Sequence, residues 1–338
     1  MTLRFCDGFD SYSTAAQLTS KWSSGTGLAF NASAGRFGGG AMLNSGAAWQ
    51  TFITKSVSVP SGSKLRIGYH LKYSAGTAPA AGAGASNYVL GANSSSMLHI
   101  NTAGLLVVTG FGVTTPYIAS SQAVNDGNFH WVELEYYLNG ASSTAQLWID
   151  GVLQGSHSGT LGNAANITSV SFGFGYVFSG TAWIDDVVIW DDQGTSFNTF
   201  PLGPRRISTL VPNADGDLAQ FTPKTGTVHY TMVNGGYGST NYVSDGGTGN
   251  VDLYRFPSLS YSPSSINAVV GNYFGQNTGS GTTNLIPKLK TSGTTVSGAT
   301  QTLTVGNNSL IQSTFVTDAG GSAWTAAAVN TMQVGMGN

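Results

Sequence analysis

The sequence predicts an all-β protein with two domains. Short runs rich in β-branched and aromatic residues recur along the 338 residues, and clusters of Gly, Asn, Asp and Ser separate them. The 47 glycines follow no collagen-like period, so they indicate many tight turns. Aromatic residues make up 11% of the chain, which is too many for a disordered chain. Together these observations favour β-sandwiches or barrels.

A hairpin near the middle of the chain is its clearest element. Residues 127–137 and 144–152 are rich in aromatic and β-branched side chains, and Leu138-Asn139-Gly140 supplies a turn between them. Asp150-Gly151 then turns the chain again. Thr14–Leu18 is expected to form one helical turn. The other strands expected in the first domain are Leu3–Phe9, Leu28–Phe30, Ala41–Leu43, Trp49–Val59, Lys64–Tyr73, Tyr88–Gly91, Met97–Asn101, Leu105–Thr109, Ile167–Phe174 and Trp183–Trp190.

Four segments follow one another in an order that identifies a family. Residues 7–12, followed by Trp22, form an opening strand and turn, and residues 35–42 turn the chain back into a sheet. The hairpin comes next, and residues 182–190 form a closing strand. This order resembles the laminin-G/concanavalin A-like lectin family. The resemblance implies a jelly-roll sandwich over residues 1–203, with its last strand beside its first and a surface built for recognition.

A second domain is expected from residue 204 to residue 338. Two prolines and a glycine in Pro201-Leu202-Gly203-Pro204 end the first domain. Residues 205–217 and 324–330 resemble a module of tailed-bacteriophage virion proteins. The module implies a small β-sandwich or barrel, and the local pattern adds a short C-terminal helix capped by Ser322 or Thr325. Its expected strands are Val228–Val233, Val251–Phe256, Ile266–Phe274, Leu285–Lys290, Gln301–Val305 and Leu310–Val316.

The charge balance restricts the partners of this chain. Only 8% of residues are charged and the net charge is −2, which argues against nucleic acid because phosphate neutralisation needs clustered cations. Weak charge repulsion favours association, so we expect homo-oligomers, with a trimer as one form. The sequence has no apolar run long enough to insert into a membrane and no signal peptide at its start. Synthesis in the host bacterial cytoplasm and location in the virion are therefore expected.

The phage resemblance implies a structural role. We expect a virion component, either associated with the tail or its fibres or decorating the capsid. It would bind other capsid or tail proteins and attach to glycans on the host surface. A free carbohydrate-binding lectin is the alternative, and a glycoside hydrolase is a third class.

Two glutamates bear on the hydrolase alternative. Glu133 and Glu135 lie two apart on one expected strand and therefore share a face. Glucanases of the concanavalin A-like fold carry a longer acidic series, and no third acid is present here. We therefore expect both glutamates to face water and the chain not to be an enzyme.

An acidic group near the end of the first domain is the candidate metal site. Asp185, Asp191 and Asp192 offer the oxygen ligands that calcium prefers, and Asp186 lies beside them. Consecutive strand residues point to opposite faces, so Asp185 and Asp186 are expected to diverge. A turn without metal is the favoured interpretation, and the five histidines show no metal-ligand spacing. No cofactor is expected.

Aromatic side chains at strand ends and in loops are the candidates for glycan binding. Sugar-binding faces of lectin-like sandwiches stack rings and surround them with Asn, Asp and Gly. The candidate residues are Trp49, Tyr88, Asn93, Tyr117 and Trp183. Most aromatic residues of a β-protein lie in cores or cross-strand pairs, so periodicity alone does not choose among these five.

Overall fold

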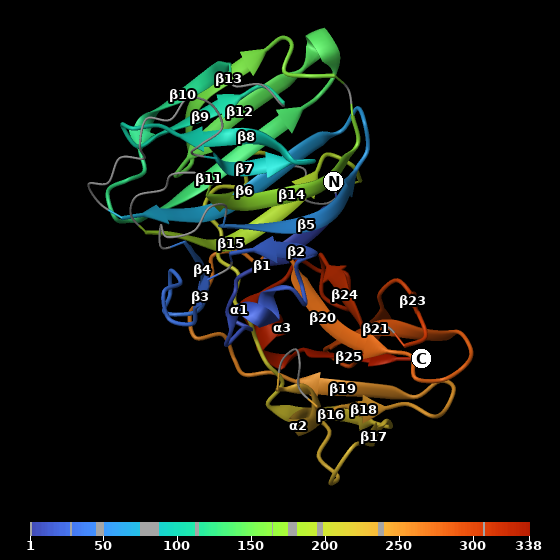
Figure 1. Ribbon diagram of the computed structural model, residues 1–338. Coiled ribbons are helices and arrows are strands. Elements are labelled where there is room, and N and C mark those ends of the chain that lie inside the picture. The colour runs from blue at the N-terminus through green and yellow to red at the C-terminus, as the bar shows by residue number, and fades with distance from the viewer. Residues whose placement is uncertain are drawn as a thin grey trace. The chain divides into compact units, whose positions relative to one another are not determined.

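The computed structural model describes residues 2–27, 29–44, 51–74, 88–111, 115–163, 165–174, 181–194, 199–235, 240–306 and 308–338. The chain divides into two compact units, Met1–Ile207 and Ser208–Asn338 (Figure 1). Both are all-β, and unit 1 is a jelly-roll sandwich, which confirms the predicted fold class. The division lies slightly after the expected boundary at residue 203, because the backbone N–H of Ile207 still donates to Asp186 in unit 1.

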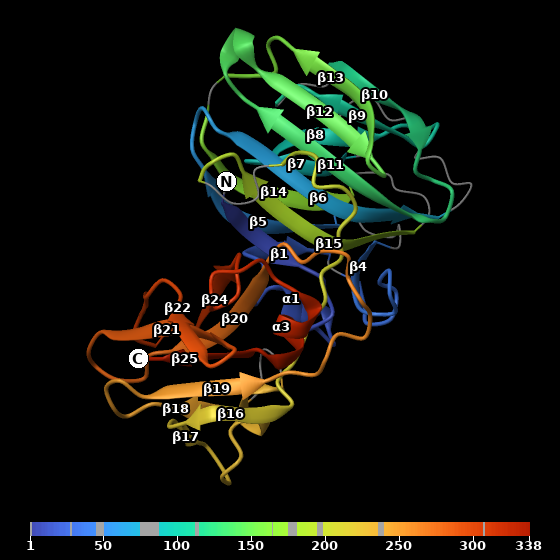
Figure 2. The ribbon, with the colours of Figure 1, turned by 180° about the vertical axis from the view of Figure 1, so that it is seen from behind.

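Unit 1 consists of two antiparallel sheets. Sheet A has the order β13 (Val152–Ser158), β12 (Thr144–Ile149), β11 (Phe129–Tyr137), β6 (Lys64–Tyr73), β15 (Ala182–Asp191), β4 (Ala41–Asn44) and β3 (Ala29–Asn31), and β1 (Leu3–Asp7) also pairs with β15 (Figure 2). Sheet B has the order β10 (Pro116–Ala123), β9 (Leu105–Thr109), β8 (Ser95–Ile100), β7 (Tyr88–Ala92), β14 (Ile167–Phe174), β5 (Thr51–Val59) and β2 (Ser24–Thr26).

The first and last strands of unit 1 lie side by side, as the family resemblance implied. Strand β1 is antiparallel to β15, with Cys6 opposite Val188 and Asp7 opposite Val187. Asp7 is buried and accepts hydrogen bonds from Tyr12, Lys21 and Trp22. This carboxylate therefore joins the opening strand to the turn that follows it.

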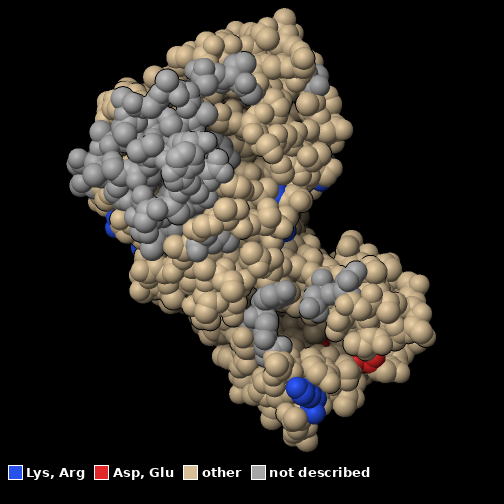
Figure 3. All heavy atoms as spheres, viewed as in Figure 1, with Lys and Arg blue, Asp and Glu red and all other residues tan. Residues whose placement is uncertain are grey.

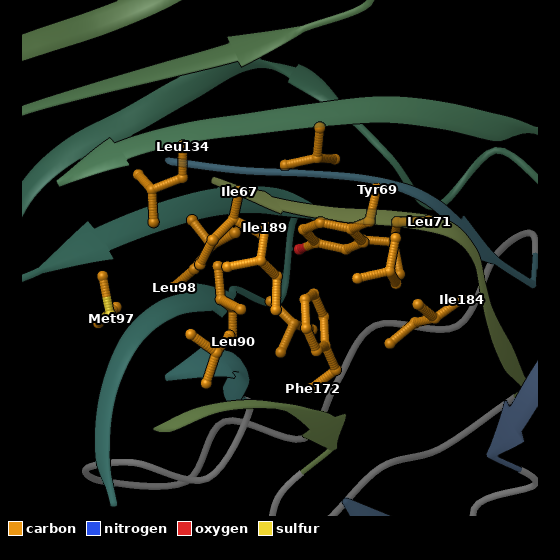
Figure 4. Close-up of a cluster of buried hydrophobic side chains, with 14 of the residues drawn as sticks. Ile67, Tyr69, Leu71, Leu90, Met97, Leu98, Leu134, Phe172, Ile184 and Ile189 are labelled. Atoms are coloured by element: carbon orange, nitrogen blue, oxygen red, sulfur yellow. The ribbon is translucent and has the colours of Figure 1, made fainter. Parts of the chain in front are cut away.

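The core lies between the two sheets because alternate residues of each strand point inward. Ile67, Tyr69 and Leu71 of β6 face Leu90 of β7 and Phe172 of β14, and all five are fully buried. Figure 4 shows these side chains converging. The rings of Tyr69 and Phe172 meet edge to face with 5.2 Å between centroids, a favourable aromatic geometry.

Helices are short throughout the described residues. Unit 1 contains α1 (Ala15–Leu18), which begins after Thr14, and the 3-10 turn η1 (Gly140–Ser142). Unit 2 contains α2 (Tyr230–Val233) and α3 (Ala326–Thr331). None of these helices has the length and apolar character that crossing a membrane requires.

Unit 2 combines one larger sheet with two ribbons. The sheet has the order β16 (Ala214–Ala219), β19 (Val251–Arg255), β25 (Gln333–Gly337), β21 (Thr283–Thr291) and β22 (Thr294–Ser297), and β23 (Gln301–Leu303) also pairs with β21. The ribbons are β17 (Thr222–Pro223) with β18 (Val243–Ser244), and β20 (Val269–Gln276) with β24 (Asn308–Phe315). Thr325 caps α3 as predicted, by accepting from the Ala328 N–H at 3.1 Å. The strand expected at 228–233 is wrong, because α2 occupies most of it.

The indole of Trp131 lies against the backbone of β6 at Gly68. A Cβ atom built on Gly68 would lie 2.5 Å from Cζ2 of Trp131, which is closer than van der Waals contact allows. Trp131 is fully buried, so its ring has little room to move. Glycine is therefore required at this position of the strand.

Replacing Gly68 with alanine is expected to lower the free energy of unfolding by about 1–3 kcal/mol, because the added methyl overpacks the Trp131 ring. Urea unfolding followed by tryptophan fluorescence measures the change. Gly281→Ala is the control, since its methyl would meet no atom within 4 Å. Equal stability of Gly68→Ala and the wild type would show that the ring does not need this glycine.

Candidate functional site

Alternate residues of three neighbouring strands build the outer face of sheet A. Strands β11, β6 and β15 lie side by side, and every second side chain points away from the core. Residues opposite one another across these strands therefore form rows. The rows run from Phe129–Lys72–Trp183 through Trp131–His70–Asp185 and Glu133–Gly68–Val188 to Glu135–Arg66–Trp190.

The segment 200–207, called the strap below, covers the middle of this face. The backbone N–H groups of Leu202 and Gly203 donate to the Glu133 carboxylate at 2.7 and 3.0 Å. Leu202 of the strap forms a separate apolar cluster with three side chains of sheet A: Trp131, Val188 and Trp190. The strap is thus fixed to sheet A by both hydrogen bonds and apolar contacts.

Both glutamates of this face are buried, and the prediction that they face water is wrong. Glu133 is 0% exposed and Glu135 is 3% exposed. Burial raises the pKa of Glu133, although the two strap amides oppose the shift. Glu135 accepts from Lys64 Nζ and Arg66 Nε, each at 2.7 Å. Each carboxylate therefore has a structural role, one holding the strap and the other pairing with the cations of β6.

The row of Phe129, Lys72 and Trp183, called the aromatic–lysine row, lies at the end of the face. All three side chains are half-buried. The Lys72 ammonium lies 4.9 Å from the centroid of the Trp183 ring and 5.5 Å from that of Phe129. Both distances fall within the range of cation–π attraction. The row therefore presents two partly exposed rings with a positive charge between them.

A bulge in β15 brings two carboxylates together beside the next row. Asp186 has a positive φ of 51°, and the pairing with β6 shifts register between Asp185 and Val188. Asp185 accepts from the Arg36 N–H at 2.8 Å, and Asp186 accepts from the Ile207 N–H at 2.7 Å. The expectation that these neighbours diverge to opposite faces is wrong, because the bulge breaks the alternation.

Burial shifts the pKa values of four ionisable side chains at and near this bulge: Asp10, His70, Asp185 and Asp186. It raises the pKa of Asp186, and together with the adjacent Asp186 charge it raises the pKa of Asp185. It also raises the pKa of Asp10 to about 6, although Gly40 donates to that carboxylate. Burial lowers the pKa of His70 to about 3, and the charge of Arg36 adds to this shift. His70 is therefore neutral near pH 7.

One contact in this group is close without being a hydrogen bond. Nδ1 of His70 lies 3.1 Å from Oδ2 of Asp186, yet the two atoms lack hydrogen-bond geometry and are both buried. A neutral imidazole carries its one hydrogen atom on either Nδ1 or Nε2. When that hydrogen is on Nε2, a protonated Asp186 carboxyl supplies the hydrogen atom between the two side chains, in agreement with the raised pKa of Asp186.

The structure describes the side chains of three of the five candidates for glycan binding: Asn93, Tyr117 and Trp183. Only Trp183 lies in the aromatic–lysine row. Trp49 lies outside the described residues, as does the side chain of Tyr88, the first residue of β7. Tyr117 belongs to β10 in the other sheet and packs on His157, with 4.3 Å between ring centroids.

Asn93 is committed to the fold. Its Oδ1 accepts from the N–H groups of Thr168 and Ser169 at 2.8 and 3.2 Å, and its Nδ2 donates to the Asn166 carbonyl at 2.7 Å. It therefore joins the turn after β7 to the start of β14, and its role in glycan binding stays a prediction.

The proposed calcium ligands hold backbone and cations instead. Asp191 is buried and accepts from Arg4 Nε at 2.7 Å and from the Thr2 N–H at 3.1 Å. Asp192 accepts from the Lys64 N–H at 3.0 Å. Within the described ranges, no three His, Cys, Asp or Glu side chains are arranged to hold a metal ion.

Sequence reasoning missed two members of the row. The sequence pattern places Lys72 and Phe129 on strands but does not predict their neighbours across the sheet. The signal was present in the alternation, because Lys72 follows the inward Leu71 and Phe129 has the parity of the outward Trp131. Only the register of β6 with β15, two strands far apart in the sequence, adds Trp183.

Comparisons with known proteins show distant likenesses in fold alone. No family model and no curated protein matches this chain. Alginate lyase Aly36B in complex with alginate tetrasaccharide is 12% identical, with a TM-score of 0.41 over 56% of this chain and 97% of that chain. Endo-β-1,4-glucuronan lyase from Trichoderma reesei is 12% identical, with a TM-score of 0.39 over 56% and 95%. A sialidase is 16% identical, with a TM-score of 0.38 over 56% and 18%.

The prediction that this chain is not an enzyme is corrected by these comparisons. It treated the sandwich as a scaffold for recognition, whereas the similar structures include lyases of alginate and glucuronan. At these identities and TM-scores, the likenesses bring neither a substrate nor a reaction to this chain.

The buried carboxyl groups make unit 1 less stable as the pH rises. A group whose pKa is higher in the folded than in the unfolded chain stabilises the fold at low pH. For Asp10 this contribution is lost as the pH rises from 3.8 through about 6, and the raised pKa values of Asp185 and Asp186 act in the same direction.

Asp186→Asn is expected to raise the free energy of unfolding at pH 7 by about 1–2 kcal/mol. The amide keeps an oxygen for the Ile207 N–H, tolerates the positive φ and offers an N–H to Nδ1 of His70. Urea unfolding between pH 4 and pH 8 provides the test. At pH 4 the variant and the wild type should nearly coincide, and a variant that is less stable at pH 7 would contradict the assignment.

Proposed function

We propose that unit 1 recognises a carbohydrate at the aromatic–lysine row. The observation that carries this proposal is the pair of partly exposed rings, Phe129 and Trp183, on either side of Lys72 at the end of the outer face. The C–H face of a pyranose is flat and apolar, so burying it against an aromatic ring is favourable. A lysine between two such rings supplies a donor for sugar oxygens.

The geometry also favours a site that exists before the ligand arrives. Backbone pairing places the three side chains opposite one another on central strands of sheet A. Rigid strands lose little conformational entropy on binding, which increases the affinity of a small contact area. Charged residues make up only 8% of the chain, and Figure 3 shows few of them on one face of the molecule.

Trp183→Ala is expected to weaken carbohydrate binding at least tenfold, because it removes the larger of the two rings. Binding is measured on a panel of neutral and acidic oligosaccharides and then by calorimetry on those that bind. Trp148→Ala is the matched control, since Trp148 is a half-buried tryptophan of β12 in the same sheet. Equal losses in the two variants, or none in Trp183→Ala, would contradict the assignment.

We also propose, from the resemblance of residues 205–217 and 324–330 to a phage module, that the protein is a structural component of a tailed-phage virion. Homo-oligomer formation and binding to capsid or tail proteins belong to this proposal. Low charge supports it, because little repulsion opposes close packing of copies.

The virion proposal predicts that the protein sediments with phage particles and stays attached in high salt. Antibody labelling of intact particles in the electron microscope locates it on head or tail. Recovery of the protein only in the particle-free fraction, as a monomer at high concentration, would contradict this role.

A further inference from the structure

The surroundings of Lys72 differ from those of the ion-paired cations of unit 1. Four cations have carboxylate partners: Arg4 with Asp191, Lys21 with Asp7, and Lys64 and Arg66 with Glu135. Lys55 donates to the Lys21 carbonyl at 2.6 Å. Lys72 forms no ion pair with any described carboxylate, and its ammonium lies between two rings instead. Its charge is therefore not neutralised by a described residue.

Acidic groups around the row are committed elsewhere. Asp185, in the next row, is buried, and its oxygens accept from the N–H groups of Arg36 and Asp186. Asp126, the partly exposed acid that precedes Phe129, accepts from Asn128 and lies 3.0 Å from Nε2 of His130. Neither acid forms an ion pair with Lys72.

We propose that Lys72 selects a sugar that carries a carboxylate, so that the ligand of the row is a uronate-containing glycan. The inference rests on the proposed carbohydrate function and names the class of ligand for the same site. The sugar ring stacks on Trp183 or Phe129, and its carboxylate accepts a hydrogen bond from Nζ of Lys72.

A carboxylate is a stronger partner for the ammonium than an aromatic ring. An exposed cation–π contact contributes about 0.5–1 kcal/mol, whereas hydrogen bonds between charged groups are roughly twice as strong as neutral ones. The rings hold the lysine in place without satisfying its three N–H donors. A ligand carboxylate therefore binds more tightly, because the Lys72 ammonium is already held in position and already partly removed from water.

The competing interpretation is that Lys72 only covers apolar surface. A lysine stem packs along aromatic rings while its charged end stays in water, and this needs no ligand. Lys72→Met separates the two interpretations, because methionine keeps an unbranched apolar stem and removes the charge. Lys72→Arg keeps the charge and is the conservative variant.

The test titrates the full chain by calorimetry with a uronate hexasaccharide and with the same hexasaccharide after its carboxyl groups have been reduced to alcohols. The wild type should bind the uronate at least tenfold more tightly, and this ratio should shrink at 0.5 M salt, which screens the pair. Lys72→Met should bring the ratio to about one, while Lys72→Arg should retain most of it. A sulfated neutral hexasaccharide shows whether any anion is accepted, and sulfate binding as tight as uronate binding would overturn the choice of carboxylate.

The outcomes separate this inference from the proposed function. If the wild type binds the uronate and its reduced form equally well, the uronate proposal is wrong and the carbohydrate function still stands. A ratio that Lys72→Met leaves unchanged overturns the role of Lys72. Failure of the wild type to bind either hexasaccharide, or any member of the oligosaccharide panel, overturns the carbohydrate function and this inference with it. Thermal unfolding of each variant confirms that it is folded.

Discussion

Hydrogen bonding of β15 to three other strands is the constraint on which unit 1 depends. One side of β15 pairs with β6 along most of its length. Its other side is shared, with β4 pairing at residues 182–184 and β1 at residues 187–190. The bulge at Asp185 and Asp186 lies where one partner ends and the other begins. This strand therefore positions Trp183 in the aromatic–lysine row, the buried acids beside it and Trp190 under the strap.

Burial of polar groups on the outer face follows from the strap. An uncovered sheet face would expose Glu133 and Trp131 to water, and the strap removes both from it. Burying a carboxylate is costly unless donors replace the lost water, and two strap amides do so for Glu133. The same logic applies at Asp186, which binds the last residue of unit 1. The chain exit is thus held by buried acids at both ends of the strap.

The row and the acids have different chemical roles. The rings and the lysine are half-buried, so a ligand reaches them from solvent. Asp185 and Asp186 are almost fully buried and accept hydrogen bonds from backbone amides. Their role is therefore to fix the conformation of β15 and the segments bound to it. Lys64 and Arg66 on the outer face pair with Glu135, whereas Lys72 on the same face forms no ion pair with a described carboxylate.

The sequence by itself determined the all-β class and the 127–152 hairpin, and it narrowed the cap of the C-terminal helix to Ser322 or Thr325, because each depends on local alternation or turn chemistry. The pairing of the first and last strands of unit 1 was implied by the family resemblance. Tertiary structure alone decided the burial of the two glutamates. The strap covers Glu133, and cations of the neighbouring strand pair with Glu135. Tertiary structure also decided that Lys72 meets Trp183, because strand register is a property of the whole sheet. Alternation tells which side chains share a face, and only the paired sheet tells which of them become neighbours.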